Sequence, residues 1–187
     1  SSIIYKENKR LQQQVERVLN VAKLDKGEIK FNKEAFDIHE IIEEAKDNLE
    51  YNQLEELNGS IQLELQAKNS IVFSDSVHIT NVIYNLLDNA IKYCVNDPKI
   101  IISTQLVKGK FQFTVTDNGK GIAKEDHKYL FDKFYRVSTG NLHDVKGFGL
   151  GLFYVKSVLT KMDGDITVKS QLEKGSSFTV TLPLNKK

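Results

Sequence analysis

The sequence of 187 residues predicts an α+β fold: a two-layer α/β sandwich whose mixed, mostly antiparallel sheet is covered on one face by about three helices. Three observations predict it. Segments with helical periodicity are interspersed with segments of alternating polar and apolar residues. Strand pairs joined by short glycine-containing turns dominate the second half of the chain. A coiled-coil-like pattern at the start predicts a separate N-terminal helix.

Size and composition suit one domain with a short appendage. At 187 residues the chain can bury a substantial core. Its single cysteine, Cys94, excludes an internal disulfide and fits a reducing compartment. No signal peptide opens the chain, and no apolar run approaches the ~20 residues needed to span a bilayer. We therefore expect a soluble, cytoplasmic domain, which can also be part of a longer receptor.

The charge is nearly balanced. A formal net charge of +1, from 26 Lys and Arg against 25 Asp and Glu, argues against a general polyanion-binding surface. Nucleic acid is therefore not an expected partner. Only Arg10, Arg17 and Arg136 are arginines, so Arg136 is the one planar, bidentate cation after residue 17.

The first 26 residues predict a helix with an apolar seam. The seam residues alternate spacings of four and three and are Ile4, Asn8, Leu11, Val15, Val18 and Ala22. Gly27 is a plausible C-terminal cap. A seam requires a partner helix, supplied by a second chain or by a helical hairpin. We therefore divide the chain into residues 1–26, the incomplete hairpin, and residues 27–187, the main domain.

The main domain shows its elements in order. Ile29 and Phe31 alternate with polar residues and predict a short strand, and Asp37 is a suitable N-cap for a following helix. Helices are predicted over 37–57, 80–93, 126–131 and 149–162. The later strands are predicted over 61–65, 71–73, 99–107, 111–116, 165–170 and 177–182.

The helix over 80–93 has two distinct faces. One face is apolar and belongs in a core. The other carries Asn85, Asp88, Asn89 and Lys92 at helical spacing. Two amide oxygens one turn apart can converge on a hard cation or on polar ligand groups. For this helix alone, asparagine merely tolerated on a surface is the favoured alternative.

Two glycine-rich segments are candidates for ligand binding. Asp117 ends a predicted buried strand and precedes Gly119 and Gly121, so its carboxylate can accept hydrogen bonds from a flat amine-bearing ring. Capping a loop is an equally good explanation. The run 147–152 begins a helix with three glycines, whose freed N–H groups suit phosphate oxygens. Close helix packing is the alternative. Residues 138–146 between them are predicted to form a mobile lid, or an ordinary loop.

The order of four segments removes much of this ambiguity. The asparagine-bearing helix, the loop 117–122, the segment 131–136 and the glycine run 147–152 resemble the N box, first glycine box, F box and second glycine box of sensor histidine kinases. The resemblance is to the catalytic, ATP-binding domain of that family, within the wider gyrase, chaperone, kinase and mismatch-repair ATP-binding superfamily. It covers about residues 24–184.

The resemblance implies a site for ATP and Mg²⁺. It implies that Asn85 and Asn89 hold the cation, that Lys92 faces phosphate and that Tyr93 faces the nucleoside. It places Asp117 at the adenine amino group and Arg136 at the γ-phosphate, with the base seated against the backbone of the first glycine box. The other residues implied to bind nucleotide are Gly119, Gly121, Ile122, Lys146, Gly147, Gly149, Leu150 and Gly151. Phe148 stands where small residues are frequent in the family, and we expect it to anchor the lid hydrophobically.

Asn85 bears on the reaction. The resemblance implies a glutamate at this position in the hydrolytic ATPases of the superfamily, and an amide cannot take a proton near neutral pH. We therefore expect transfer of the γ-phosphoryl group to a neutral imidazole, with Asn85, Lys92 and Arg136 as the catalytic residues. A hydrolytic ATPase, or a non-catalytic domain that binds nucleotide or a partner, remains the alternative.

The accepting histidine is not evident in this sequence. His39, His78, His127 and His143 lack the setting that the family gives it, so we interpret them as structural or surface residues. The resemblance places the acceptor on an upstream helix, and we do not expect this chain to phosphorylate itself alone. It further implies a homodimer formed through the N-terminal helix, a response-regulator receiver domain as partner, and an inner-membrane sensor as one possible parent.

Overall fold

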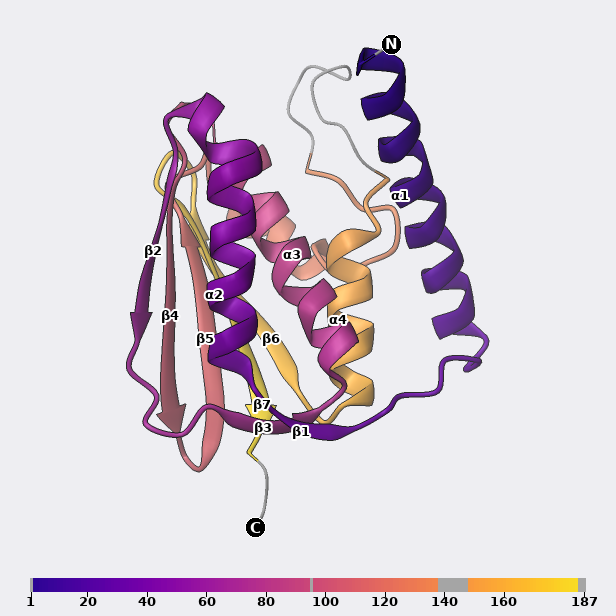
Figure 1. Ribbon diagram of the computed structural model, residues 1–187, viewed down its shortest axis with the longest axis vertical. Helices are drawn as coiled ribbons and strands as arrows, with labels where there is room; N and C mark the ends of the chain where they lie inside the picture. Colours follow the sequence, from indigo (N-terminus) through magenta and orange to yellow (C-terminus); the bar gives the residue numbers. More distant parts are fainter. Residues whose placement is uncertain (1, 95, 138–147, 185–187) are drawn as a thin grey trace.

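The computed structural model describes residues 2–94, 96–137 and 148–184. Its main layer is a five-stranded sheet in the order β2-β4-β5-β7-β6. Helices α2 (Ile38–Leu49), α3 (Ser76–Lys92) and α4 (Gly151–Lys161) cover one face of this sheet (Figure 1). The predicted two-layer α+β sandwich is therefore confirmed.

The sheet is mixed and mostly antiparallel, as predicted. Strand β2 (Ser60–Leu65) runs parallel to β4 (Lys99–Val107), and the other pairings are antiparallel. Strands β5 (Lys110–Asp117), β7 (Gly175–Pro183) and β6 (Asp165–Gln171) complete it. Because side chains alternate across a strand, β5 sends Phe111, Phe113 and Val115 into the helix-covered core.

Helix α3 is the centre of the helical layer. Its N-cap is Asp75, whose side chain accepts a hydrogen bond from the N–H of His78. This cap starts the helix four residues before the predicted start. Seven apolar residues of α3 are buried between the sheet and the other helices: Ile79, Val82, Ile83, Leu86, Leu87, Ala90 and Ile91.

Two predicted elements differ from the structure, and one strand was not predicted. Residues 28–33 form no strand, so the strand predicted around Ile29 and Phe31 is wrong; both side chains instead pack against the core. Strand β1 (Glu34–Asp37) follows and pairs only with β3 (Ile71–Ser74), in a separate two-stranded sheet. The segment predicted as a helix over 126–131 is the 3₁₀ helix η3 (Lys124–Tyr129).

The helix predicted over 37–57 changes character after Leu49. Asp37 is its N-cap as predicted, accepting from the N–H of His39. A π-helical turn, η1 (Glu50–Leu54), and a 3₁₀ turn, η2 (Glu55–Leu57), follow α2. Periodicity alone cannot separate these turns from an α-helix because the apolar spacing differs only slightly.

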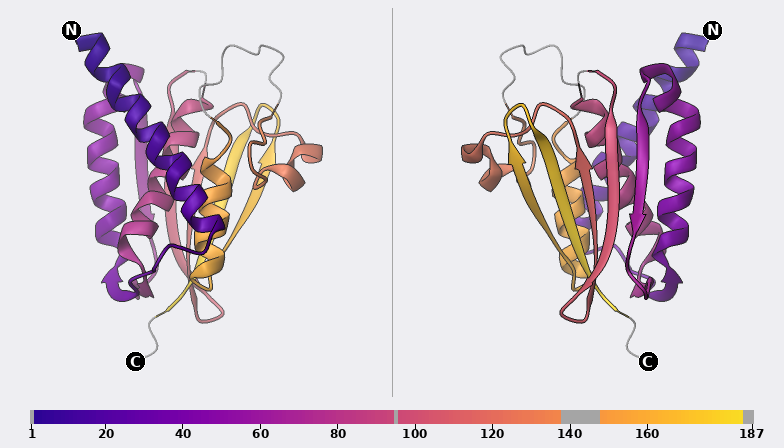
Figure 2. Two further views of the ribbon diagram at one scale, coloured as in Figure 1. Left: turned by 90° about the vertical axis from the view of Figure 1, so that its right-hand side faces the viewer. Right: turned by 90° about the vertical axis from the view of Figure 1, so that its left-hand side faces the viewer.

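Helix α1 (Ser2–Asp25) lies beside α4, as both views of Figure 2 and the element contacts agree. It ends at Asp25, just before the predicted cap Gly27, which has φ +66°. Val21 and Leu24 are buried against the sandwich, whereas Val15 and Val18 are 58% and 45% exposed. The seam residues whose side chains the structure describes, Asn8, Val15, Val18 and Ala22, are therefore exposed rather than packed on the sandwich. No helix in the described part of the chain is long and apolar enough to cross a membrane.

Candidate functional site

A cavity of about 590 Å³ lies between the C-terminal half of α3, the loop after β5 and the start of α4. It brings together most of the residues predicted to form the site. Those lining it are Asn85, Asn89, Lys92, Tyr93, Asp117, Gly121, Ile122, Arg136, Gly149, Leu150 and Gly151. Gly119 does not line it, and Lys146 and Gly147 fall outside the described residues, as does the whole predicted lid, residues 138–146.

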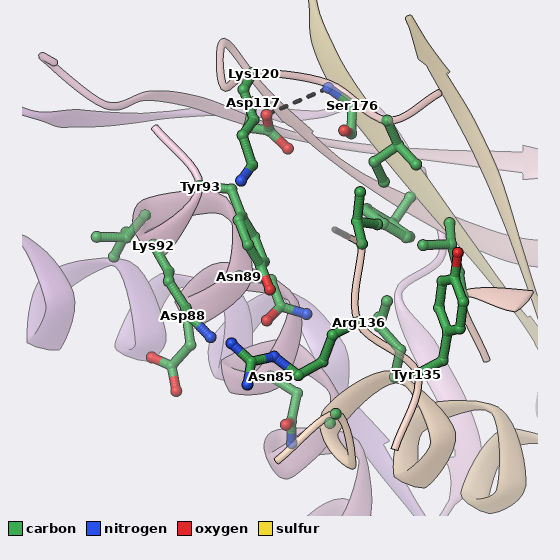
Figure 3. A pocket seen from close by; sticks show the side chains of 18 of the residues that line it. Asn85, Asp88, Asn89, Lys92, Tyr93, Asp117, Lys120, Tyr135, Arg136 and Ser176 are labelled. Carbon is green, nitrogen blue, oxygen red and sulfur yellow. Dashed lines mark hydrogen bonds between the residues drawn. The ribbon is translucent and has the colours of Figure 1, made fainter. Parts of the chain in front are cut away.

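The amides of α3 stand at one end of this cavity. The side-chain nitrogen of Asn85 donates to the carbonyl of Asn81 at 2.8 Å. Its oxygen lies 3.0 Å from where a Cβ on Gly151 would be. The Asn85 oxygen is therefore fixed against the start of α4. Figure 3 shows Asn85, Asn89 and Lys92 around the same part of the cavity as the guanidinium of Arg136.

Asp117 stands at the other end and is buried, with 8% of its surface exposed. Its Oδ1 accepts hydrogen bonds from the backbone N–H of Gly119 at 2.8 Å and of Ser176 at 3.2 Å. Burial raises the pKa of this carboxyl, and the two N–H donors lower it. Figure 3 shows the second carboxylate oxygen directed into the cavity. The backbone thus fixes one oxygen and leaves the other aimed toward a ligand.

The glycines of this loop pack against neighbouring backbone. Gly121 has φ +69°, and a Cβ there would lie 1.9 Å from the carbonyl oxygen of Gln171. A Cβ on Gly119 would lie 2.7 Å from the carbonyl oxygen of Tyr93. The sequence suggested that these glycines make room for a flat ring. The structure adds a second physical reason for glycine here, close contact between chain segments.

Tyr93 sits between two lysines. The ammonium groups of Lys92 and Lys120 lie 5.1 and 5.0 Å from its ring centroid, within cation–π range. Burial raises the pKa of the Tyr93 phenol, and the charge of Arg136 opposes that rise. Burial also lowers the pKa of Lys120, which lines the cavity. Lys120 was not predicted as a site residue, because nothing in the sequence shows that it folds over Tyr93.

The segment before the lid is tied to the segment after it. The N–H of Phe134 donates to the carbonyl of Gly149 at 3.0 Å. A Cβ on Gly149 would lie 2.6 Å from the carbonyl oxygen of Tyr135, so glycine is required for this approach. The phenol of Tyr135 donates to Asp126 at 2.5 Å, and this hydrogen bond raises the pKa of Tyr135 to about 12. These contacts hold the segment that presents Arg136.

Comparison with known proteins identifies the family. A sequence model described as "Histidine kinase-, DNA gyrase B-, and HSP90-like ATPase" matches residues 74–186, which include every element that lines the cavity except η1. The chain belongs to this family.

Relatives within the family are sensor histidine kinases. The chain is 43% identical over its whole length to the sensor protein RprX of Bacteroides fragilis (strain YCH46), covering 36% of that protein. It is 32% identical over 97% of its length to the sensor protein SrrB of Staphylococcus aureus, covering 31% of it. The chain thus spans about a third of the length of these relatives.

A solved structure shares the fold. The histidine kinase AdeS of Acinetobacter baumannii superposes with a TM-score of 0.77 at 26% identity, covering all of this chain and 86% of that one. The match includes helix α1 as well as the sandwich. The fold and the arrangement of this ATPase-family domain are therefore those of histidine kinases.

The residues that sequence reasoning missed come from distant elements. Ser176 reaches Asp117 because β5 pairs with β7 in the register that places these two residues opposite each other. Gln53 lines the cavity from the π-helical turn η1. Neither residue lies in a recognisable motif. Only the pairing of strands and the packing of helices bring them to the site.

The described histidines take structural places, as predicted. His39 contacts the hydroxyl of Thr104 at 2.9 Å, and His78 contacts the phenol of Tyr154 at 2.7 Å. His127 lies 3.3 Å from the carbonyl oxygen of Ile122. None of these three lines the cavity. His143 lies outside the described residues.

The oxygen donors at the Asn85 end of the cavity suit a cation that is bound mostly by water and phosphate. Within the described residues no group of three or more His, Cys, Asp and Glu side chains could hold a metal ion. What this end of the cavity offers is the amides of Asn85 and Asn89 and the carboxylate of Asp88. Few oxygen donors of this kind fit Mg²⁺, which binds through one or two protein ligands plus phosphate and water.

Proposed function

We propose that this chain is the catalytic domain of an ATP-dependent protein-histidine kinase of a two-component system. It binds Mg²⁺–ATP in the described cavity and transfers the γ-phosphoryl group to a histidine on another helix. Family membership and the 43% identity to the sensor protein RprX support ATP binding and the kinase class. The observation that favours transfer over hydrolysis is that residue 85, at the phosphate end, is an asparagine.

The geometry suggests how the nucleotide lies. The buried carboxylate of Asp117 is the acceptor for an exocyclic amine, and the ring of Tyr93 offers a flat surface for a purine. The triphosphate then extends along α3 toward Lys92 and Arg136, whose charges oppose those of the phosphates. Asn89 and Asn85 would hold Mg²⁺, which neutralises charge on the phosphate oxygens when bound.

Asn85 favours transfer because its side chain cannot act as a base. Hydrolysis requires a group that takes a proton from water, and a side-chain amide is no base near neutral pH. An imidazole nucleophile needs no such base, because its neutral form carries a lone pair. Positioning and electrostatic stabilisation then suffice for phosphoryl transfer.

Hydrolysis is the second candidate because a carboxylate is nearby. Asp88 lines the same cavity one turn from Asn85 and could activate water in its place. In Figure 3 the Asp88 carboxylate lies on the side of α3 away from Asp117. The two reactions give different products, which an assay can tell apart.

We further propose the partners of the parent protein. Helix α1 would pair with its counterpart in a second copy, and the phosphoryl group would pass to an aspartate of a response-regulator receiver domain. The exposed seam of α1 and the identity to sensor proteins support these proposals.

The test supplies a helical hairpin that bears a histidine, taken from a homologous sensor kinase, together with γ-labelled ATP and Mg²⁺. We expect acid-labile phosphate on the hairpin, and its loss when Asn89→Ala removes a proposed Mg²⁺ ligand. Steady release of inorganic phosphate without label on the hairpin would instead establish hydrolysis. Asp88→Asn would then abolish that release.

A further inference from the structure

A smaller cavity of about 310 Å³ lies where strands β5, β6 and β7 meet behind the nucleotide cavity. Its walls come from the ends of these three strands and from the turn between β6 and β7. Because β5 sends Val115 into the helix-covered core, its neighbour Thr116 lies on the opposite face of the sheet. We therefore call this space the outer cavity.

Two lysines bring positive charge to the outer cavity. Lys169 of β6 and Lys174 of the turn before β7 both line it. Within the described residues neither ammonium group makes a hydrogen bond or an ion pair. Asp117 is the one carboxylate among the described residues of these walls. Two cations against one carboxylate leave the outer cavity with a net positive charge.

A pair of hydroxyl groups lies beside Lys169. The strand register places Ser177 opposite both Lys169 and Thr116, so the three side chains stand abreast. The two hydroxyl oxygens of Thr116 and Ser177 are 3.0 Å apart, and either can be the donor. Each hydroxyl has one proton, so the bond between them uses one and leaves the other for a ligand.

Gly175 keeps the end of this row open. It lines the outer cavity with φ +91°, and a Cβ there would lie 1.9 Å from the carbonyl oxygen of Asp117. A side chain is therefore excluded at this position. The cavity persists because the fold itself requires a glycine in its wall.

The outer cavity and the nucleotide cavity share a wall. Asp117 and Ser176 line both. The N–H of Ser176 donates to Asp117 across this wall at 3.2 Å, as Figure 3 shows. Behind it, the hydroxyl of Ser170 accepts from the N–H of Ile122 at 2.8 Å. The hairpin of β6 and β7 thus forms the outer cavity and also holds the loop that follows Asp117.

We propose that the outer cavity binds a phosphate group, free or as the monoester of a small molecule, with Asp117 as its acidic wall. Lys169 and Lys174 supply opposite charge, and the remaining hydroxyl proton of the Thr116–Ser177 pair supplies a third donor. A phosphate group offers several acceptor oxygens to such donors. This site goes beyond the proposed function, because no step of phosphoryl transfer uses it.

The experiment titrates inorganic phosphate, and separately glycerol 1-phosphate, into the protein at constant ionic strength. A saturating Mg²⁺-bound, non-hydrolysable ATP analogue fills the nucleotide cavity, so that neither ligand binds there. The backbone amide signals of Gly175 and Ser177 report binding by NMR. We expect saturable shifts of both signals. Similar affinities for the two ligands assign the site to the phosphate group alone, and tighter binding of glycerol 1-phosphate assigns it to a phosphomonoester; either result supports the site.

The double substitution Lys169→Met and Lys174→Met removes both cations. We expect it to weaken phosphate binding at least about tenfold, the loss of two charged donors that are partly screened by solvent. Lys108→Met with Lys110→Met is the matched control, because it removes the same charge at the far end of β5 and touches no wall of the outer cavity. This control should bind phosphate like the unmodified protein.

Three results would overturn the proposal. One is equal phosphate affinity in the Lys169 and Lys174 double variant and the unmodified protein. Another is equal weakening in the control, which would show diffuse attraction to surface charge. The third is the absence of saturable shifts at Gly175 and Ser177.

Asp117→Asn tests the shared wall. The substitution removes a negative charge that repels a bound phosphate, so phosphate should bind at least about threefold more tightly, followed through the same two amides. Unchanged affinity would show that Asp117 is not part of this site. If the ATP analogue does not bind the protein, the proposed function fails, whereas the shifts of Gly175 and Ser177 still decide this inference.

Discussion

Asp117, at the proposed adenine end of the cavity, is buried and held in one orientation. Two backbone N–H groups hold one oxygen, so little side-chain entropy is lost when the other accepts from a ligand amine. A hydrogen bond to a charged group contributes roughly 1.5–3 kcal/mol. This residue is therefore expected to supply much of the selectivity for an amine-bearing base.

The raised pKa of Asp117 predicts a pH dependence of binding. The carboxylate accepts well only when charged, so affinity for an ATP analogue is full near neutral pH and falls as pH drops through its pKa. Because burial raises that pKa, the fall begins at a higher pH than for a solvated aspartate. Fluorescence titrations between neutral and acidic pH would measure it.

Asp117→Asn is the control, because its amide has no charge to lose over this range. The pH dependence that the variant retains belongs to the nucleotide phosphates and to other groups. Parallel pH profiles for the variant and the unmodified protein would show that Asp117 does not contact the base.

The sequence identified those site residues that can be recognised from their type and spacing alone. Asp117, Tyr93 and Asn85 stand out because their residue types and spacing indicate a role. Lys120 and Gln53 do not, because their direction depends on the backbone around them. Ser176 meets Asp117 only through the β5–β7 register. Sequence patterns therefore locate the chemistry of this site but not the residues that support it.

At the scale of elements, periodicity predicted α3, α4 and the hairpin of β4 and β5 with ends within a few residues of those observed. Periodicity did not predict the features that depend on contacts between residues far apart in the sequence. β1 and β3 form a sheet of their own because they pair with each other rather than with a strand of the main sheet. The π-helical turn after α2 was likewise invisible, since it is fixed by contacts with β2.

The loop after β5 gives a prediction about stability. Gly121→Ala places a Cβ 1.9 Å from the carbonyl oxygen of Gln171 at φ +69°. The backbone conformation costs about 1–2 kcal/mol for an L-residue, and the overlap adds roughly 1–3 kcal/mol. Urea denaturation should show a lower free energy of unfolding, by the sum of both contributions.

Gly109→Ala separates the two contributions. This glycine has φ +73°, and no atom lies within 4 Å of a Cβ there. We expect only the conformational cost of about 1–2 kcal/mol. If both variants lose the same stability, the close contact between Gly121 and Gln171 has no energetic weight.

For the whole molecule, α1 has two faces with different tasks. Val21 and Leu24 join the core of the sandwich, and Asp25 pairs with Lys133. Val15, Val18 and Leu19 are exposed on the same helix. The predicted seam and the attachment to the sandwich thus use different residues, which allows α1 to contact another helix while it holds the domain.

The double substitution Val15→Glu and Val18→Glu tests association through this seam. If a second copy covers it, placing two charges there should weaken dimerisation at least about tenfold, measured by sedimentation velocity over a range of concentrations. Val21→Ala is the control: it should lower the unfolding free energy by roughly 1–3 kcal/mol and leave association unchanged. A sedimentation profile that the seam variant shares with the unmodified protein would argue against dimerisation through α1.

The central claim is that the cavity between α3, the Asp117 loop and α4 binds ATP with its base at Asp117. Calorimetric titration of a Mg²⁺-bound ATP analogue into the unmodified protein and Asp117→Ala tests it most directly. We predict that the variant binds about tenfold to a hundredfold more weakly, the loss of a charge-assisted hydrogen bond of ~1.5–3 kcal/mol. Equal affinities in a variant that is still folded would contradict the claim.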